Sequence, residues 1–157
     1  PGIYSGLVLA GANRGVAFSL ANPTQTDNGI LTAAEFADLD LRRTRLVVLS
    51  ACETGLGEAA CGEGMLGLQR SLHAAGAESV VASLWNVDDE ATSALMVEFY
   101  RNLLERKLGR LDALREAQLA LLHGKLVRPV DVEQNRSRPA VLPPRYWAAF
   151  FLSGDWR

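Results

Sequence analysis

The stretch Leu46–Gly55 (LVVLSACETG) decides the fold of this chain. Its first four residues are all apolar, which is typical of a central strand covered by helices on both faces. Glycines are dense directly after it, at positions 55, 57, 62, 64 and 67. A buried strand that runs into a glycine-rich turn indicates an α/β architecture with a binding or reactive site at the end of the strand.

Three other short apolar segments are expected to be strands because they are rich in aliphatic, β-branched and aromatic residues. They are residues 7–10 (LVLA), 79–84 (SVVASL) and 147–152 (WAAFFL). Segments with helical spacing lie between them. This alternation predicts an α/β fold with a mostly parallel sheet.

Four helices are expected from caps and from apolar spacing. Thr32 and Glu35 fit a capping box, which predicts a short helix to about Asp38. The other three are predicted to run over 65–72 with a stop at Gly76, from Asp88 or Asp89 to near Gly109, and from about Asp112 to His123 with a stop at Gly124.

The whole chain, residues 1–157, is predicted to be a single domain, since 157 residues can bury a core of their own. Residues 125–145 are polar and carry four prolines, at positions 129, 139, 143 and 144. Proline disrupts both helices and central strands, so this segment is predicted to be a long loop or insertion.

Composition excludes several classes of function. The net charge is −2 and the basic residues are spread among the acidic ones, so no basic face for nucleic acid or an anionic membrane is expected. No apolar run approaches the roughly 18 residues that a membrane span needs, and export is not expected, because the sequence does not open with the basic and then apolar segment of a leader. Two cysteines cannot form a disulfide framework, which favours a reducing, cytoplasmic location.

Cys52 is the strongest candidate for a reactive residue. A tight turn after a strand lifts the side chain out of the sheet, and small neighbours let a substrate approach the sulfur. The amides of the turn, including that of Cys52, could stabilise an oxyanion. The alternative is a buried core cysteine, because free cysteine is among the most buried residue types. A phosphate-binding loop is disfavoured, since no Lys-Ser or Lys-Thr pair follows the glycines.

Several blocks of the chain, in order, resemble the CHAT domain family. They are residues 48–55 (VLSACETG), 62–64 (GEG), 75–77 (AGA), 81–89 (VASLWNVDD), 99–100 (FY), 117–118 (AQ), 146–150 (YWAAF) and 154–156 (GDW). The resemblance implies a caspase-like three-layer α/β/α sandwich whose amino-terminal side is incomplete in this chain. It also implies a cysteine peptidase domain, attached to or associated with tetratricopeptide-like repeats that regulate it.

In this family the catalytic dyad pairs a cysteine with a histidine at the end of the preceding strand. The resemblance therefore assigns Cys52 as the nucleophile and its amide as the oxyanion donor, and it expects the histidine upstream of Pro1. His73 and His123 lie on predicted helices rather than at strand ends, so neither is expected to replace it. This chain alone is therefore expected to be inactive.

The resemblance also implies a binding site for protein substrates. An extended peptide is expected to pair with Leu84, Trp85 and Asn86. Asp89, with Asp88 and Glu53, is expected to bind a basic side chain next to the cleaved bond. Helix capping is the alternative role for the two aspartates.

No cofactor or metal is expected, because two scattered histidines and two cysteines lack zinc-ligand spacing. Cys61 is interpreted as a loop residue rather than a redox partner of Cys52. Two other functions remain open for the chain. One is a non-catalytic interaction or scaffold domain that keeps the fold without the dyad, and the other, more distant, is a phosphate-binding enzyme.

Overall fold

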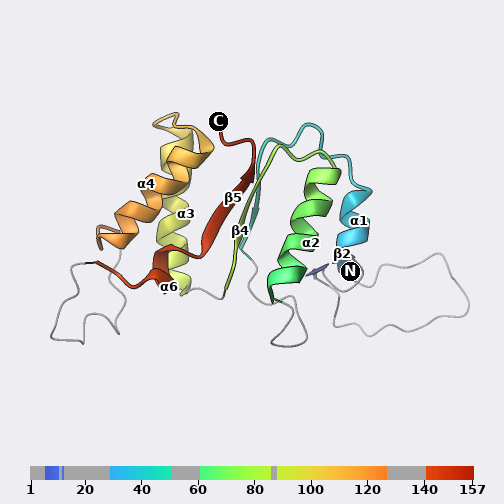
Figure 1. Cartoon of the computed structure of the whole chain (residues 1–157), viewed down its shortest axis with the longest axis horizontal. Coiled ribbons are helices and arrows are strands. Elements are labelled where there is room, and N and C mark those ends of the chain that lie inside the picture. Colours follow the sequence, from blue (N-terminus) through green and yellow to red (C-terminus); the bar gives the residue numbers. More distant parts are fainter. Residues whose placement is uncertain (1–5, 11, 13–28, 51–60, 86–87, 127–140) are drawn as a thin grey trace, which may run out of the picture. The chain divides into compact units, whose positions relative to one another are not determined.

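The computed structural model describes residues 6–10, 12, 29–50, 61–85, 88–126 and 141–157 (Figure 1). Residues 61–63 are described by their backbone alone. The chain divides into two compact units, each defined by itself. The first unit is Pro1–Thr44 with Glu53–Ala77, and the second is Arg45–Cys52 with Glu78–Arg157.

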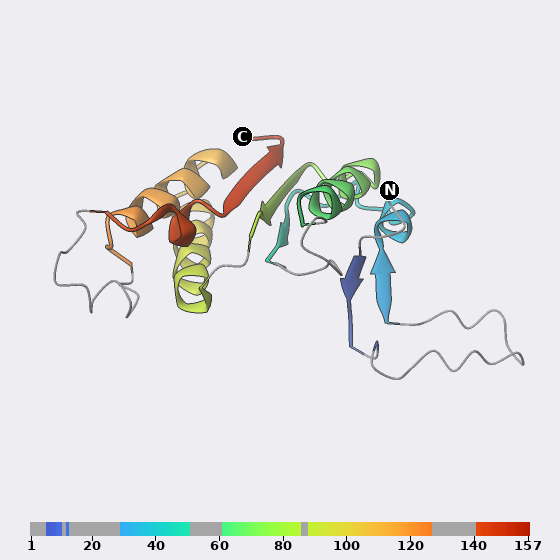
Figure 2. The ribbon, with the colours of Figure 1, turned by 60° about the horizontal axis from the view of Figure 1, so that its bottom comes forward.

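The first unit contains a two-stranded antiparallel sheet and two helices. Strand β1 (Gly6–Val8) pairs with β2 (Ile30–Thr32), with Gly6 opposite Thr32, and Figure 2 shows the two side by side. The expected strand at 7–10 is thus shifted by one residue at its start and ends earlier. Helix α1 (Ala33–Ala37) follows β2 directly and contacts α2 (Cys61–Ala74). Cys61, interpreted from the sequence as a loop residue, is thus the first residue of α2.

The capping box predicted at the start of α1 is confirmed. The Glu35 amide donates to Thr32 Oγ1 at 3.3 Å, and the Thr32 amide donates to Glu35 Oε2 at 2.8 Å. The bond from the Thr32 backbone, followed by that from its side chain, lowers the pKa of Glu35 from its ordinary 4.5. The two residues thus provide acceptors for two backbone N–H groups that would otherwise lack a hydrogen-bond partner at the start of the helix.

Thr32→Ala is expected to lower the free energy of unfolding by about 1 kcal/mol, because it removes the capping hydroxyl. The pKa of Glu35 is lower in the folded state than in the unfolded state. The contribution of Glu35 to the free energy of unfolding is therefore present above its unfolded-state pKa and is lost as the pH falls through its folded-state pKa. Urea unfolding at pH 7 and pH 3 should therefore show a smaller cost for Thr32→Ala in acid. Thr44→Ala, outside the helix, is the control, and an equal cost at both pH values would contradict the pH dependence.

Helix α2 ends at the glycine that the sequence indicates. Gly76 has φ +106°, its amide donates to the His73 carbonyl, and the Ala77 amide donates to the Leu72 carbonyl. A Cβ on Gly76 would also lie 2.7 Å from Arg42 Cγ. Glycine is therefore required here both for the backbone angle and for the close approach of the segment at Arg42.

The second unit contains a three-stranded sheet in the order β3-β4-β5. Strand β3 (Val47–Leu49) is parallel to β4 (Ser79–Ser83), as predicted, and all five residues of β4 are buried. Strand β5 (Phe150–Gly154) is antiparallel to β4. The sheet is therefore mixed among the described residues, and the prediction of a mostly parallel sheet fits only its β3-β4 pair.

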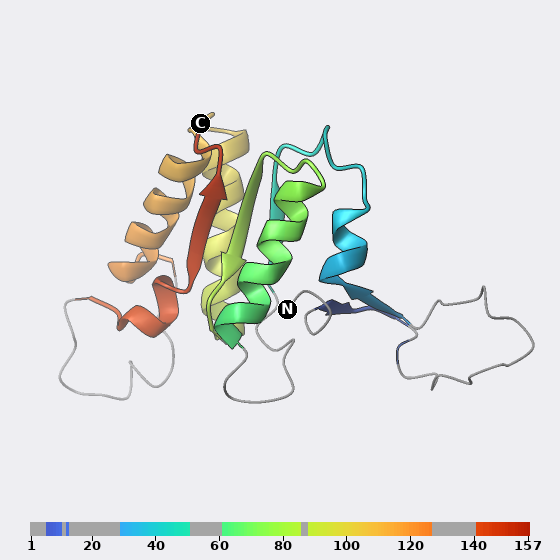
Figure 3. The same ribbon diagram turned by 45° about the vertical axis from the view of Figure 1, so that its right-hand side comes forward.

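Two long helices cover one face of this sheet, as Figure 3 shows. They are α3 (Asp89–Leu104) and α4 (Arg110–Leu122), which pack against each other. Val48, Val81 and Leu152 stand in one row across the three strands and belong to the core below the helices. The fully buried helix residues in this core are Ala91, Leu95, Phe99, Ala113, Ala117 and Leu121.

Helix α3 ends at Leu104 rather than near Gly109. The Arg106 amide donates a hydrogen bond to the Arg101 carbonyl, and the Leu108 amide donates to the Asn102 carbonyl. Lys107 takes the positive φ, 57°, that closes this turn. Because a lysine fills a position usually held by glycine, the sequence pattern placed the end of the helix too late.

The expectation of a loop over 125–145 fails at its carboxyl end, and residues 127–140 lie outside the described part. Leu142 is buried, and helix α6 (Pro144–Trp147) begins within the expected loop. Proline is favourable at the first helical position because it has no backbone N–H, and an N–H there would have no acceptor within the helix. Trp147 is therefore the last residue of a helix. The strand expected at 147–152 begins three residues later, as β5 (Phe150–Gly154).

Candidate active site

The elements of the second unit converge at one edge of its sheet. Since β3 and β4 are parallel, with Leu49 opposite Ala82, their carboxyl ends lie side by side. The antiparallel β5 begins at the same edge, with Phe150 opposite Ser83. Helix α3 starts a few residues after β4, and α6 directly precedes β5. We call this region the carboxyl edge, formed by Ser50, Leu84, Trp85, Asp88, Asp89 and α6.

The structure places four of the seven predicted site residues at the carboxyl edge. Leu84, Trp85, Asp88 and Asp89 are described and all are exposed. Cys52, Glu53 and Asn86 lie outside the described residues, so the roles assigned to them, including the oxyanion role of the Cys52 amide, stay predictions. The described residue nearest to Cys52 in sequence is Ser50, which is exposed directly after β3.

Leu84 and Trp85 present apolar side chains to solvent although their main chain is held in place. Their side chains are 46% and 37% exposed, while Ser83 just before them is buried. The Leu84 amide donates to the Ala149 carbonyl at 2.9 Å. Trp85 Nε1 donates to the Arg145 carbonyl at 3.2 Å. Exposed apolar side chains on a fixed backbone are typical of a recognition surface.

The two aspartates have different environments. Asp88 is the N-cap of α3, and its Oδ1 accepts from the Ala91 amide at 2.9 Å. Asp89 is the first residue of the helix, and its carboxylate makes no hydrogen bond or ion pair with any residue that the structure describes. The capping role is therefore confirmed for Asp88. The carboxylate of Asp89 is exposed at the helix start, where a ligand can reach it.

Neither described histidine follows a strand. His73 lies in the last turn of α2, with Nδ1 3.0 Å from the Ala77 carbonyl oxygen. His123 is the exposed C-cap of α4. Both positions agree with the expectation that these histidines are helix residues rather than members of a dyad.

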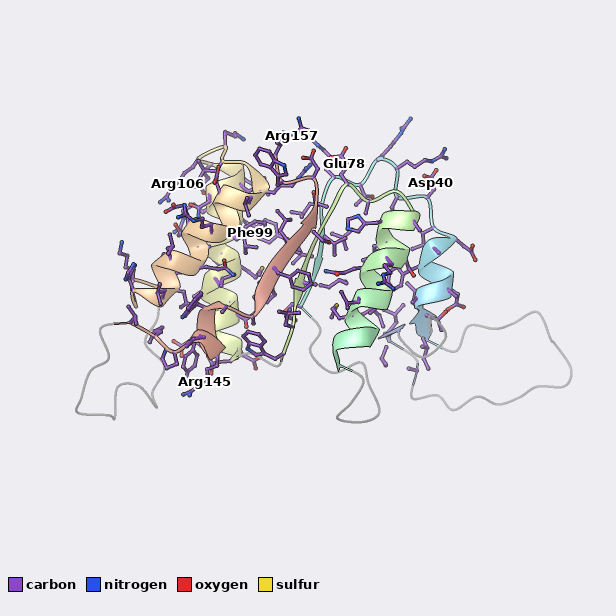
Figure 4. The ribbon with its side chains drawn as sticks, in the orientation of Figure 1. Asp40, Glu78, Phe99, Arg106, Arg145 and Arg157 are labelled. Atoms are coloured by element: carbon purple, nitrogen blue, oxygen red, sulfur yellow. The ribbon has the colours of Figure 1, made fainter. Side chains whose placement is uncertain are left out.

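Sequence reasoning missed one residue of the carboxyl edge, Arg145 on α6. Arg145 supplies the carbonyl that binds the Trp85 indole, and its Nη2 donates to the Tyr146 hydroxyl at 2.9 Å. Its guanidinium carbon also lies 4.7 Å from the centre of the Tyr146 ring. Figure 4 marks Arg145 on α6. The Pro143-Pro144 pair, which fits a helix start as well as a loop, was the signal that could have indicated α6.

The ion pairs of Arg110 lie at the opposite edge of the sheet. The buried Arg110 donates to Glu78 at 2.8 Å and lies 3.5 Å from the carboxylate of Asp155. Backbone and side-chain hydrogen bonds from Arg157 lower the pKa of Asp155, and the charges of Arg157 and Arg110 add to this effect. These contacts join the start of β4, the start of α4 and the end of β5, so their role is to hold the sheet to the helix.

The described ranges contain no group of three or more His, Cys, Asp or Glu residues that could hold a metal ion. Within the same ranges, none of the helices combines the length and the apolar character that crossing a membrane requires.

The second unit is a mixed α/β fold whose parallel strand pair ends at the carboxyl edge, with β3 directly before the Cys52 segment in sequence. Residues 3–155 match the CHAT domain, so the chain belongs to the CHAT domain family, a caspase-like peptidase family. Membership implies a caspase-like fold. No solved structure matches the chain.

Two curated relatives are similar to part of the chain. Tetratricopeptide repeat protein 28 of Mus musculus and that of Homo sapiens are each 34% identical to it over 126 residues. The matched region is 80% of this chain but only 4% of each relative. The relatives are thus repeat proteins by name, and nearly all of their length lies outside the region that resembles this chain.

Proposed function

We propose that this chain carries the nucleophile of a cysteine peptidase that cleaves protein substrates after a basic residue. The observation that carries the proposal is the carboxyl edge: β3 ends three residues before Cys52 and is paired with β4, which is followed by the exposed Leu84 and Trp85. Family membership supports the reaction class. The family's second catalytic group, a histidine, is proposed to lie upstream of Pro1.

The proposed reaction proceeds through a thioester. The Cys52 thiolate attacks the carbonyl carbon of the scissile peptide, and the amides of its turn stabilise the oxyanion. The C–N bond breaks as the upstream histidine gives a proton to the leaving amine. Water then attacks the thioester, which releases the carboxylic acid product and restores the thiol. A reducing compartment such as the cytoplasm would keep this thiol free.

The main chain at the end of β4 supports binding of an extended peptide. The Leu84 amide is occupied by the Ala149 carbonyl on the β5 side. Trp85 follows Leu84 in a bend after β4, and we propose that its main-chain groups are the ones that a substrate meets. A substrate added there would form β-sheet hydrogen bonds with Trp85 and, we propose, Asn86.

Asp89 is proposed to bind the basic side chain of the substrate. Its carboxylate is exposed at the carboxyl edge, whereas the neighbouring Asp88 is committed to the helix cap. A carboxylate can accept charge-assisted hydrogen bonds from arginine or lysine, which are stronger than bonds between neutral groups. Glu53, outside the described residues, is proposed to assist.

Asp89→Ala in the full-length protein is expected to lower kcat/KM about tenfold for substrates with Arg or Lys before the cleaved bond, because a charge-assisted hydrogen bond is lost. Substrates with a neutral residue there should change little. Asp88→Ala is the matched control: it should cost about 1 kcal/mol of stability as a lost cap, without changing this preference. Equal losses for basic and neutral substrates in Asp89→Ala would assign specificity to another residue.

The proposed function itself is tested by covalent labelling of the full-length protein. A peptide electrophile that carries arginine next to its reactive carbonyl should modify Cys52, as located by mass spectrometry. Labelling should depend on the histidine encoded upstream of Pro1, which is expected in a His-Gly pair at a strand end. If Cys52 is unlabelled and no such histidine is encoded, the chain is instead an interaction domain that serves the attached repeats.

A further inference from the structure

Helix α6 is linked to the indole of Trp85 across sixty residues of sequence. The link is the 3.2 Å hydrogen bond from Trp85 Nε1 to the main-chain carbonyl of Arg145. The acceptor is a backbone atom, so its position depends on the helix rather than on the rotamer of one side chain. The hydrogen bond therefore restrains the Trp85 indole relative to α6.

Several contacts fix α6 to the core of the second unit. Tyr146 is 6% exposed and Leu142 is 5% exposed, and both belong to the core cluster. The Leu142 amide donates to the Leu122 carbonyl at the end of α4, at 2.7 Å. Trp147 Nε1 donates to the Leu142 carbonyl at 3.0 Å, which closes the segment onto itself. A short helix with these contacts is a rigid support.

The side chain of Arg145 is also held on α6. Its guanidinium donates to the Tyr146 hydroxyl and lies over the Tyr146 ring. Since the Tyr146 ring is buried, these two interactions restrain an otherwise exposed side chain. The arrangement gives the edge residue Arg145 a fixed backbone and a restrained side chain.

We propose that α6 positions Trp85, and thereby the end of β4, for binding of an extended substrate. This role rests on the proposed peptidase function. Leu84 is fixed through its amide to Ala149 and Trp85 through its indole to Arg145, so both residues are ordered before a substrate arrives. Ordering a side chain in advance removes part of the cost of binding, so the link affects KM rather than the chemical step.

Indole hydrogen exchange tests the link without any need for activity. The chain has three tryptophans, and their indole N–H signals are assigned in the full-length protein by Trp→Phe changes at each position. Trp85 and Trp147, which both donate to carbonyls, should exchange slowly. Trp156, 60% exposed, should exchange fast. Exchange at Trp85 as fast as at Trp156 would overturn the inference.

Peptide-cleavage kinetics test the role of the link. Trp85→Phe keeps an aromatic ring but removes the donor, and KM should rise about threefold to tenfold with a smaller change in kcat. Trp156→Phe, the same change at an exposed position, should leave both constants unaltered. An unchanged KM in Trp85→Phe, or a loss confined to kcat, would overturn the positioning role.

The two measurements distinguish this inference from the proposed function. A wild-type protein that neither cleaves nor binds peptide refutes the peptidase function and, with it, the positioning role. Slow exchange at Trp85 in that same sample would show that the link itself exists. Fast exchange in a protein that does cleave peptides would refute the link alone.

Discussion

Cys52→Ala in the full-length protein is expected to lower kcat for peptide cleavage by at least roughly 10³-fold, because it removes the thiol that we propose forms the thioester. The expected loss is larger than that for any specificity residue, since binding at the carboxyl edge would be retained while the covalent step disappears. Steady-state rates with an arginine-containing peptide measure it. Cys52→Ser is a second variant, and it should be almost as slow because a hydroxyl is a much weaker nucleophile than a thiolate.

Cys61→Ala is the matched control, because it removes the chain's other thiol. It should leave both constants near those of the wild type. The melting temperature of Cys52→Ala should remain close to that of the wild type, which separates loss of chemistry from loss of the fold. Cleavage that persists in Cys52→Ala, or is lost equally in Cys61→Ala, would contradict the assignment of the nucleophile.

The elements that sequence predicted well are those whose signal is local. The hydroxyl and carboxylate of Thr32 and Glu35 sit three residues apart, and their capping box depends on nothing beyond that turn. Gly76 ends α2 because only glycine takes its backbone angle easily. The buried β4 was recognisable because each of its residues meets protein rather than water.

The elements that were misplaced depend on distant contacts. The direction of β5 is set by its pairing with β4, and a short apolar run has the same composition in either direction. Helix α6 has four residues, too few for a periodic pattern, and its stability comes from Tyr146 and Leu142 in the core. The end of α3 depends on Lys107 taking a conformation that its residue type does not indicate.

In the candidate site, too, the features with a local sequence signal were predicted and those that depend on distant contacts were not. The sequence indicated that Leu84, Trp85 and the two aspartates follow a strand, and the structure places them at the carboxyl edge. It did not indicate which aspartate would cap the helix, because both residues suit that role and only the backbone geometry at Asp88 decides it. The contact of Trp85 with Arg145 spans sixty residues and has no local signal.

Phe99→Ala is expected to lower the free energy of unfolding by about 4 kcal/mol, the largest effect on stability that the described core offers. Phe99 is 0% exposed, and Figure 4 shows it on α3 on the side toward β5. Its ring belongs to the cluster that joins α3 and α4 to the sheet, so its removal costs both the burial of the ring and the cavity left behind. Denaturant unfolding of the purified protein measures the change in free energy. Thermal unfolding should show a fall in melting temperature of roughly 10 °C.

Val97→Ala is the matched control, two residues away on the same helix, where the side chain is 55% exposed. It should change stability by less than about 0.5 kcal/mol, because little of the side chain leaves water on folding. Comparable losses in the two variants would mean that α3 does not pack against the sheet through the Phe99 face. In that case Asp88 and Asp89 at the helix start would no longer be held at the end of β4, since the packing of α3 is what carries them there.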